Sequence, residues 1–156
     1  MISPDLEYVG FWPRVGATII DTILIWIVTT PFLIAVYGKS WAMSLDRPFI
    51  SGPAEFLLSW VFPAIATVIF WQRRQATPGK MAISARVVDA ETGAPLTVGQ
   101  CIGRYLAYFA SVLPLCLGLI WVAFDPRRQA WHDKLAGSVV VRSKQRGPEP
   151  VKFGRV

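Results

Sequence analysis

The stretch "FWPRVGATIIDTILIWIV", residues 11–28, begins a long apolar run and yet contains Arg14 and Asp21, seven positions apart. The run from Val15 to Tyr37 covers 23 residues. As a helix it spans about 34 Å, enough to cross a hydrocarbon core of about 30 Å. Seven residues turn a helix by about 700°, so Arg14 and Asp21 lie on one face, about 10 Å apart along its axis. The sequence therefore predicts a membrane helix with an aspartate inside it.

The composition of the whole chain also favours a membrane setting. Hydrophobic residues make up 53% of the 156 residues, charged residues 17%, and the mean hydropathy is +0.43, whereas soluble domains carry about 25% charged residues. This length suits a single domain, residues 1–142. The basic, Gly- and Pro-punctuated tail, residues 143–156, is predicted to be disordered. Because the acidic start does not resemble a signal peptide, the first helix is expected to remain in the mature protein.

Two further apolar runs follow the first. Phe56–Trp71 covers 16 residues without a charge, and Tyr105–Phe124 covers 20 with Pro114 near its centre. Lys and Arg number two in residues 38–54 and four in residues 73–100, which predicts a cytoplasmic second loop and amino terminus. Eight basic residues follow the third run and favour a cytoplasmic tail. That run therefore either returns at Pro114 as a re-entrant segment or crosses against the charge bias.

Short extended segments are expected between and after these runs. "ISARVVDAETGAPLTV", residues 83–98, predicts a β-hairpin around its Glu-Thr-Gly turn, and "AGSVVVR", residues 136–142, predicts another strand. "TPGK", residues 77–80, lacks the upstream glycine of a phosphate-binding loop and is interpreted as a turn. The predicted fold class is thus an all-α membrane protein, a bundle of two to three transmembrane helices with a small cytoplasmic strand element.

Asp21 is the first candidate for chemistry. A carboxylate inside a membrane costs on the order of 2.5 to 3.5 kcal/mol, so it usually has a partner or faces a wet cavity. The alternatives are a functional acid and a hydrogen bond that locks two helices together. Arg104, at the start of the third run, is a candidate cationic partner, and Thr18 could add a hydroxyl. Arg14 is interpreted mainly as an anchor at the cytoplasmic boundary, and tryptophans near the run ends, such as Trp71, as headgroup anchors.

A second polar stretch, "FDPRRQAWHDKLAG", residues 124–137, follows the third run. It contains Arg127, Arg128, Asp133 and His132, the only histidine, which is expected to be a surface residue. One histidine cannot form a metal site from this chain, and no nucleophile elbow or His-Glu-x-x-His run occurs. We therefore expect no enzyme, metal or cofactor. The two cysteines, without redox spacing, are interpreted as packing thiols.

Three of these motifs together resemble the RDD family of small bacterial membrane proteins, named for one arginine and two aspartates. They are "PRVGATIID", "TPGKMAISARVVDAETGAPLT" and "RRQAWHDKLAGSVVV". The resemblance covers the chain from Phe11 to Arg142. It assigns the arginine to Arg14 and the aspartates to Asp21 and Asp133, with Arg104 at a further basic position. The secondary candidates of the whole sequence are Thr18, Lys80, His132, Arg127 and Arg128.

The resemblance implies a multi-pass protein of the bacterial inner membrane, with the lipid bilayer and no nucleic acid as partner. Transport has been suspected in the family, cation/proton exchange has been proposed for some members, and roles beside other membrane proteins for others. Two hypotheses follow. Several copies could assemble around Asp21 to exchange protons and cations, or the chain could be an accessory subunit that assembles a larger membrane protein.

Overall fold

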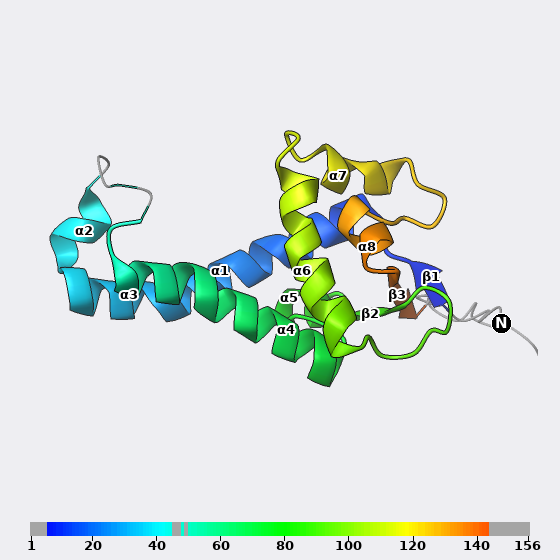
Figure 1. The fold of residues 1–156 in the computed structure, drawn as a ribbon, viewed down its shortest axis with the longest axis horizontal. Helices are drawn as coiled ribbons and strands as arrows, with labels where there is room; N and C mark the ends of the chain where they lie inside the picture. The colour runs from blue at the N-terminus through cyan, green and yellow to red at the C-terminus, as the bar shows by residue number, and fades with distance from the viewer. Residues whose placement is uncertain (1–5, 45–47, 49, 144–156) are drawn as a thin grey trace, which may run out of the picture.

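The computed structural model describes residues 6–44, 48 and 50–143 (Figure 1). Of the tail predicted at residues 143–156, the part from residue 144 lies outside this description, and Ser143 is the last residue of a strand. Two parts are evident in Figure 1: a long helical hairpin, and an end where a small sheet and the remaining helices gather.

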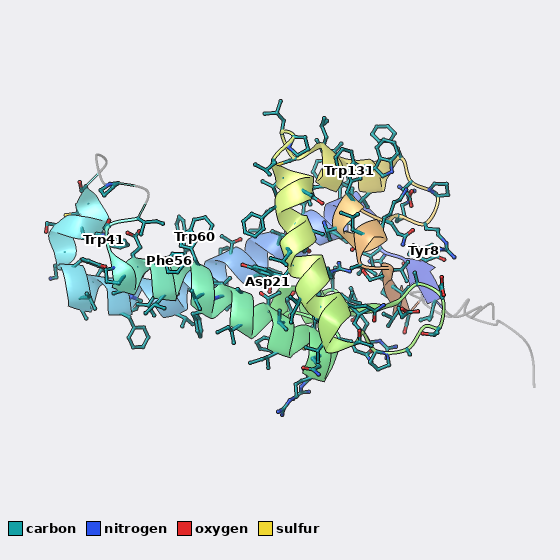
Figure 2. All side chains as sticks on the ribbon, viewed as in Figure 1. Tyr8, Asp21, Trp41, Phe56, Trp60 and Trp131 are labelled. Atoms are coloured by element: carbon teal, nitrogen blue, oxygen red, sulfur yellow. The ribbon has the colours of Figure 1, made fainter. Side chains whose placement is uncertain are left out.

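The hairpin consists of two antiparallel apolar helices joined by short helical segments (Figure 1). Its first arm, α1, and its second arm, residues 53–74, are both long and apolar enough to cross a membrane. Figure 2 shows Asp21 where the hairpin meets the sheet-bearing end, and Trp41 and Trp60 toward the opposite end. The elements are α1 (Phe11–Tyr37), α2 (Lys39–Met43), α3 (Pro53–Phe56), the π-helical turn η1 (Leu57–Val61) and α4 (Phe62–Arg74).

The hairpin leaves most of its apolar side chains on the outside. In α1 only Ala17, Thr29 and Leu33 are buried, whereas Trp26 is 69% exposed and Ile27 63%. A contiguous apolar surface of this extent is unfavourable in water. Lipid is the solvent that matches it, in agreement with the predicted membrane helices.

The third apolar run forms two helices instead of one. They are α6 (Val98–Val112) and α7 (Leu117–Ile120), the latter continued by a 3₁₀ turn, η2 (Trp121–Ala123). The axes of the two parts differ by 110°. Leu115 and Cys116, at the bend, have positive φ angles of 54° and 61°. The predicted break near Pro114 is therefore present, and it is sharper than a proline kink.

Helix α6 begins seven positions before the predicted start at Tyr105. The reason is a capping box: the Thr97 hydroxyl accepts the N–H of Gln100 at 3.3 Å, and the Gln100 side chain accepts the N–H of Thr97 at 3.0 Å. These bonds satisfy amide groups that a helix start otherwise leaves unpaired. The T-x-x-Q pattern is present in the sequence, but it lies among polar residues outside the apolar run, so hydropathy alone did not indicate a helix start there.

The sheet has three antiparallel strands in the order β1 (Leu6–Tyr8), β3 (Ser138–Ser143), β2 (Ala85–Asp89). The predicted strand at residues 136–142 is present as β3. The predicted hairpin within residues 83–98 is wrong, because β2 pairs with β3 and residues 94–97 form no strand. The "TPGK" segment is not a plain turn either, since it forms the start of the short helix α5 (Pro78–Ala82).

The sheet decides how the third run is arranged. Its strands come from before α1, after α4 and after η2, so these segments lie on the same side of the hairpin. A single membrane crossing by residues 98–123 would separate β2 from β3. The pairing therefore supports the returning form of this run, in which the 110° bend sends the chain back.

The core lies where the sheet meets α4 and α6. It contains Val9, Trp71, Val87, Cys101 and Val140, each at most 1% exposed. Trp71 is thus a core residue, and its predicted role as a headgroup anchor is wrong. The second thiol, on Cys116, is exposed at the bend, so the packing role predicted for both thiols fits Cys101 alone.

Candidate functional site

Asp133 is the centre of the first polar cluster. It lies in the short helix α8 (Trp131–Leu135), and its side chain is fully buried. One carboxylate oxygen lies 2.5 Å from Nη1 of Arg14, and the other lies 2.5 Å from Nη2 of Arg104. The first oxygen also accepts the N–H of Ala130 at 3.0 Å. The arginine–aspartate centre, Arg14, Arg104 and Asp133, thus joins α1, α6 and α8.

Both arginines bind further groups. Arg14 donates from Nε to the carbonyl of Val9 at 3.0 Å and from Nη2 to the carbonyl of Arg128 at 2.6 Å. Arg104 donates from Nη1 to the hydroxyl of Ser138, and its guanidinium lies 5.1 Å from the centroid of the Trp71 ring. Although burial opposes the charged form, Arg104 and Arg14 hold the pKa of Asp133 well below its ordinary value. Asp133 is therefore an ionised structural carboxylate.

His132 is buried, at 3% exposure, and its predicted surface position is wrong. Its ring stacks on Tyr108 with centroids 3.7 Å apart, and Nδ1 lies 3.1 Å from the hydroxyl of Ser111. Nε2 lies 3.3 Å from Asp133. Burial lowers the pKa of His132 to about 3, although Asp133 opposes that shift. The imidazole is therefore neutral near pH 7.

This Ser–His–Asp arrangement resembles a nucleophile with its base, but no substrate could reach the serine. Ser111 is 0% exposed. Its hydroxyl donates to the carbonyl of Ala107 at 3.2 Å and accepts the N–H of His132 at 3.0 Å. The hydrogen bonds between Ser111 and His132 therefore hold α6 against α8.

Asp21 belongs to a separate cluster, in which α5 rests against α1. One carboxylate oxygen accepts the Thr77 hydroxyl at 2.5 Å, and the other accepts the N–H of Gly79 at 2.7 Å. A Cβ added at Gly79 would overlap the carbonyl of Ala17 and lie 2.9 Å from the Asp21 carboxyl carbon. Glycine is thus required for this close approach. Asp21, on α1, therefore caps the start of α5. Of the two alternatives for Asp21 that the sequence left open, this contact corresponds to the hydrogen bond that locks two helices together.

The structure corrects the proposed partners of Asp21. Arg104 is bound to Asp133 and does not pair with Asp21. Thr18 donates to the carbonyl of Arg14 at 3.0 Å, within α1, so it does not bridge the Arg14 and Asp21 side chains. Arg14 and Asp21 share a helix, yet they bind different segments, α8 and α5.

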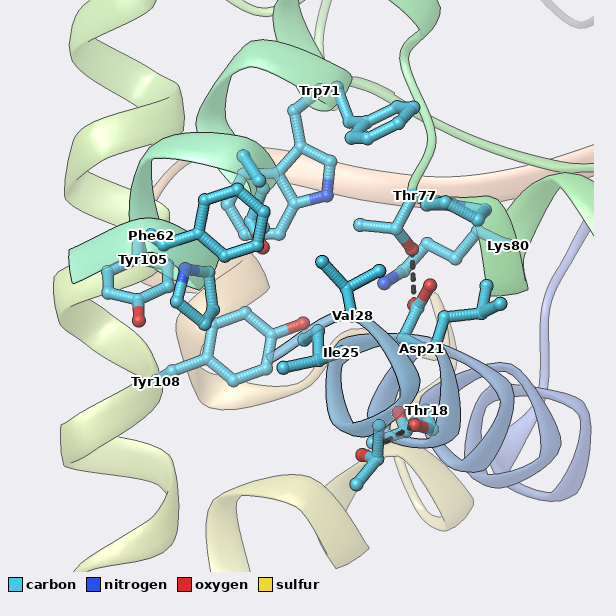
Figure 3. A pocket seen from close by; sticks show the side chains of 17 residues that line it. Thr18, Asp21, Ile25, Val28, Phe62, Trp71, Thr77, Lys80, Tyr105 and Tyr108 are labelled. Carbon is cyan, nitrogen blue, oxygen red and sulfur yellow. Dashed lines mark hydrogen bonds between the residues drawn. The ribbon is translucent and has the colours of Figure 1, made fainter. Parts of the chain in front are cut away.

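A cavity of about 460 Å³ opens beside Asp21, between α1, α4 and α6 (Figure 3). Its walls are mostly apolar and include Ile25, Val28 and Phe62. Asp21 and Lys80 lie at one end, and Figure 3 shows the Lys80 ammonium directed into the cavity. The cavity is therefore amphipathic, with its charged groups, Asp21 and Lys80, where α5 meets α1.

Two donors on the cavity wall have no hydrogen-bond partner among the described residues. Lys80 is 7% exposed, and no carboxylate of the described residues lies within 4.0 Å of its ammonium, which lies 6.0 Å from the centroid of the Trp71 ring. The indole N–H of Trp71, a residue 1% exposed, is likewise unpaired. Buried donors without partners are uncommon and call for an explanation.

The remaining candidates, Arg127 and Arg128, lie in the loop before α8. The Arg127 backbone N–H donates to Asp125 at 3.1 Å, and the Arg128 side chain donates to the carbonyl of Ala123 at 3.1 Å. The Lys134 ammonium lies 2.5 Å from the Asp125 carboxylate. Burial raises the pKa of Asp125, but the contact with Lys134 and the backbone N–H groups of Gln129 and Arg127 outweigh burial, so the pKa is lowered. Arg127 and Arg128 shape the loop and do not enter the cavity.

Sequence reasoning missed several residues that complete these clusters. Ser111 and Ser138 lie in apolar or β-branched stretches, where a lone hydroxyl gives no signal of its partner. Thr77 and Gly79 lie in the "TPGK" motif, whose fit to the RDD pattern could have identified them. Trp71 could be found only from its burial.

Comparison with known proteins identifies the family of this chain. The pattern described as the RDD family matches residues 8–137. This chain belongs to the RDD family. Arg14, Asp21 and Asp133, which the motif resemblance assigns to the arginine and the two aspartates, lie in the matched part, and each binds a segment distant in sequence.

Relatives of this RDD protein occur in Bacillus subtilis and Rickettsia prowazekii. It is 29% identical over 150 residues to the uncharacterized membrane protein YteJ of Bacillus subtilis, covering 88% of this chain and 82% of that protein. It is 27% identical over 146 residues to the uncharacterized protein YxaI of the same organism, covering 85% and 95%. The uncharacterized protein RP437 of Rickettsia prowazekii is 36% identical over 76 residues, 49% of this chain and 42% of that protein. No solved structure matches.

Proposed function

We propose that this RDD protein is a multi-pass membrane protein that binds an amphiphile from the bilayer in the cavity between α1, α4 and α6. The observation that carries the proposal is the cavity, whose volume of about 460 Å³ falls within the range of small-molecule sites. Its apolar walls belong to helices that are apolar enough to span a membrane. A hydrocarbon chain with one polar head matches walls that are apolar along their length and polar at one end. This is a binding role and not a catalytic one.

The hairpin supports a position of the cavity inside the membrane. Its second arm has 22 residues, which span about 33 Å as a helix. From Asp21 to Tyr37 the first arm extends about 24 Å, so the cavity's polar end lies near one boundary of the hydrocarbon layer. Arg73 and Arg74 end α4 at that boundary. Positive residues favour the cytoplasmic side, which we assign to the sheet and the amino terminus.

Photolabelling tests this proposal. The purified protein is placed in lipid nanodiscs with a fatty acid that carries a photoreactive group on its chain, and the adducts are mapped by peptide mass spectrometry. We expect adducts at the cavity wall, near Val28 and Phe62. Ala66→Trp, which fills the cavity, is expected to remove them, whereas Ile65→Trp, on an exposed position of the same helix, is a matched control. Adducts spread evenly over the lipid-facing surface would contradict the proposal.

Cation/proton exchange is a second candidate, favoured by the presence of Asp21 on the cavity wall. Both of its oxygens already accept hydrogen bonds, so exchange requires α5 to release them. In the described part of the chain no group of three or more His, Cys, Asp and Glu could hold a metal ion, so Asp21 is the carboxylate on which this candidate rests.

Proteoliposomes test the exchange. The protein should move protons in response to Na⁺, K⁺ or Li⁺ and lose this activity in Asp21→Asn. Absence of flux at every pH would exclude it. The accessory role stays a prediction, and crosslinking in native membranes that recovers only self-contacts would count against it.

A further inference from the structure

The unpaired donors at the polar end of the cavity point to the kind of head it binds. Lys80, a residue that is 7% exposed, directs its ammonium there with no carboxylate within 4.0 Å among the described residues, and Trp71 adds a buried, unpaired indole N–H. An isolated ammonium or amide-like donor is costly away from water unless an acceptor meets it. The missing group is therefore a hydrogen-bond acceptor. An anionic acceptor can accept hydrogen bonds from both donors and also compensates the charge of the ammonium.

Asp21 does not fill this need. Its two oxygens are engaged by Thr77 and Gly79, so its carboxylate holds α5 in place. For the same reason a basic head would find no free carboxylate in the cavity. The arginine–aspartate centre and the Asp21 cluster together hold three cations, Arg14, Arg104 and Lys80, against two carboxylates. These two clusters therefore hold one cation more than carboxylates.

We infer that the amphiphile has an acidic head, a phosphate or a carboxylate, which binds Lys80 and Trp71 while its chain lies along Ile25, Val28 and Phe62 (Figure 3). The inference rests on the proposed function, because it assigns a head to the amphiphile of that cavity. Two sources supply such heads: the phosphate of a bilayer phospholipid, and a free fatty acid. Both place the charge near the boundary of the hydrocarbon layer, at the level of α5.

The test compares photoreactive amphiphiles that share one chain and differ in the head: a carboxylic acid, an alcohol and a primary amine. A second pair, phosphatidic acid and phosphatidylcholine with the same photoreactive chain, tests the head among phospholipids, and the comparison of phosphatidic acid with the free carboxylic acid separates the two sources. Binding is measured as cavity adducts against competitor concentration in nanodiscs of neutral lipid. We expect the acid to bind about tenfold or more tightly than the alcohol, because a charged hydrogen bond is added. The amine is expected to be weakest.

Variants assign the preference to the two donors. Lys80→Met should reduce binding of the acid to the level of the alcohol, and Lys80→Arg should retain most of the preference. Trp71→Phe, which keeps a ring but removes the N–H, should reduce it partially. Arg74→Met removes an exposed cation at the end of α4 and is the matched control. Continued binding of the alcohol by Lys80→Met shows that this variant is folded.

The outcomes separate this inference from the proposed function. Cavity adducts with equal affinity for acid and alcohol, or an acid preference that survives Lys80→Met, would overturn the acidic head and leave the binding function standing. Absence of cavity adducts with every head would overturn both. A preference for phosphatidic acid over the free acid identifies a bilayer phospholipid as the source, and the reverse order identifies a fatty acid; each result supports the acidic head.

Discussion

At the scale of the single residue, Asp133 has the largest structural role, because its buried carboxylate meets arginines from two helices. Removing one partner of a buried ion pair leaves the other charge without compensation, at a cost of about 3–5 kcal/mol. Asp133→Asn should therefore lower the free energy of unfolding by about this amount. Denaturant titration in detergent measures it, with exposed Glu91→Gln as control. Equal stability of the two variants would contradict the structural role.

His132 makes the fold sensitive to acid. Its pKa is about 3 in the folded protein and 6.5 in an unfolded chain, so the unfolded state binds more protons between these values. Stability should be fully present above pH 6.5 and fall progressively toward pH 3. Asp133, with its lowered pKa, adds a loss that begins only below its ordinary pKa of 3.8.

Thermal unfolding midpoints at roughly pH 7, 5.5 and 4.5 test this prediction, because the first lies above the range in which the unfolded state binds the extra proton and the other two lie within it. His132→Gln, which cannot titrate, should flatten the dependence in this range. Arg104, Arg14 and Lys80 are the cations that act on His132, and each of them lowers the pKa of its imidazole. An unchanged slope in the variant would assign the acid sensitivity to other groups.

At the scale of the element, α5 is held on α1 by Asp21 and by the absence of a side chain at Gly79. Gly79→Ala should force the two helices apart and destabilise the protein by about 1–3 kcal/mol, the usual range for overpacking. Gly103→Ala, in the interior of α6 where an added Cβ meets nothing within 4 Å, should be neutral or stabilising by up to about 1 kcal/mol. Comparable losses of free energy of unfolding in both variants would contradict the role of Gly79 in holding α5 against α1.

At the scale of the whole molecule, the sheet places the segments before and after the membrane helices on one side. In a background with Cys101 and Cys116 replaced by Ala, single cysteines at Glu91 and Ser143 should react with an impermeant thiol reagent from the same side. A cysteine at Ser44, beyond the far end of α1, should react from the opposite side. Labelling of Glu91→Cys and Ser143→Cys from opposite sides would mean that the third run crosses the membrane.

The sequence by itself determined the apolar hairpin, the break near Pro114 and the strand at residues 136–142. These features depend on local composition and on hydropathy over one helix length, which a single segment carries. It also identified Arg14, Asp21 and Asp133, through motifs that match the RDD family.

Only the tertiary structure decided which of these residues meet. Arg14 binds Asp133 across 119 positions, Asp21 binds Thr77 across 56, and β2 pairs with β3 instead of closing a hairpin. Spacing along the chain cannot specify such contacts, because they arise from how three helices and a sheet pack together. The cavity and its unpaired Lys80 are a product of the same packing, since their walls come from four separate elements.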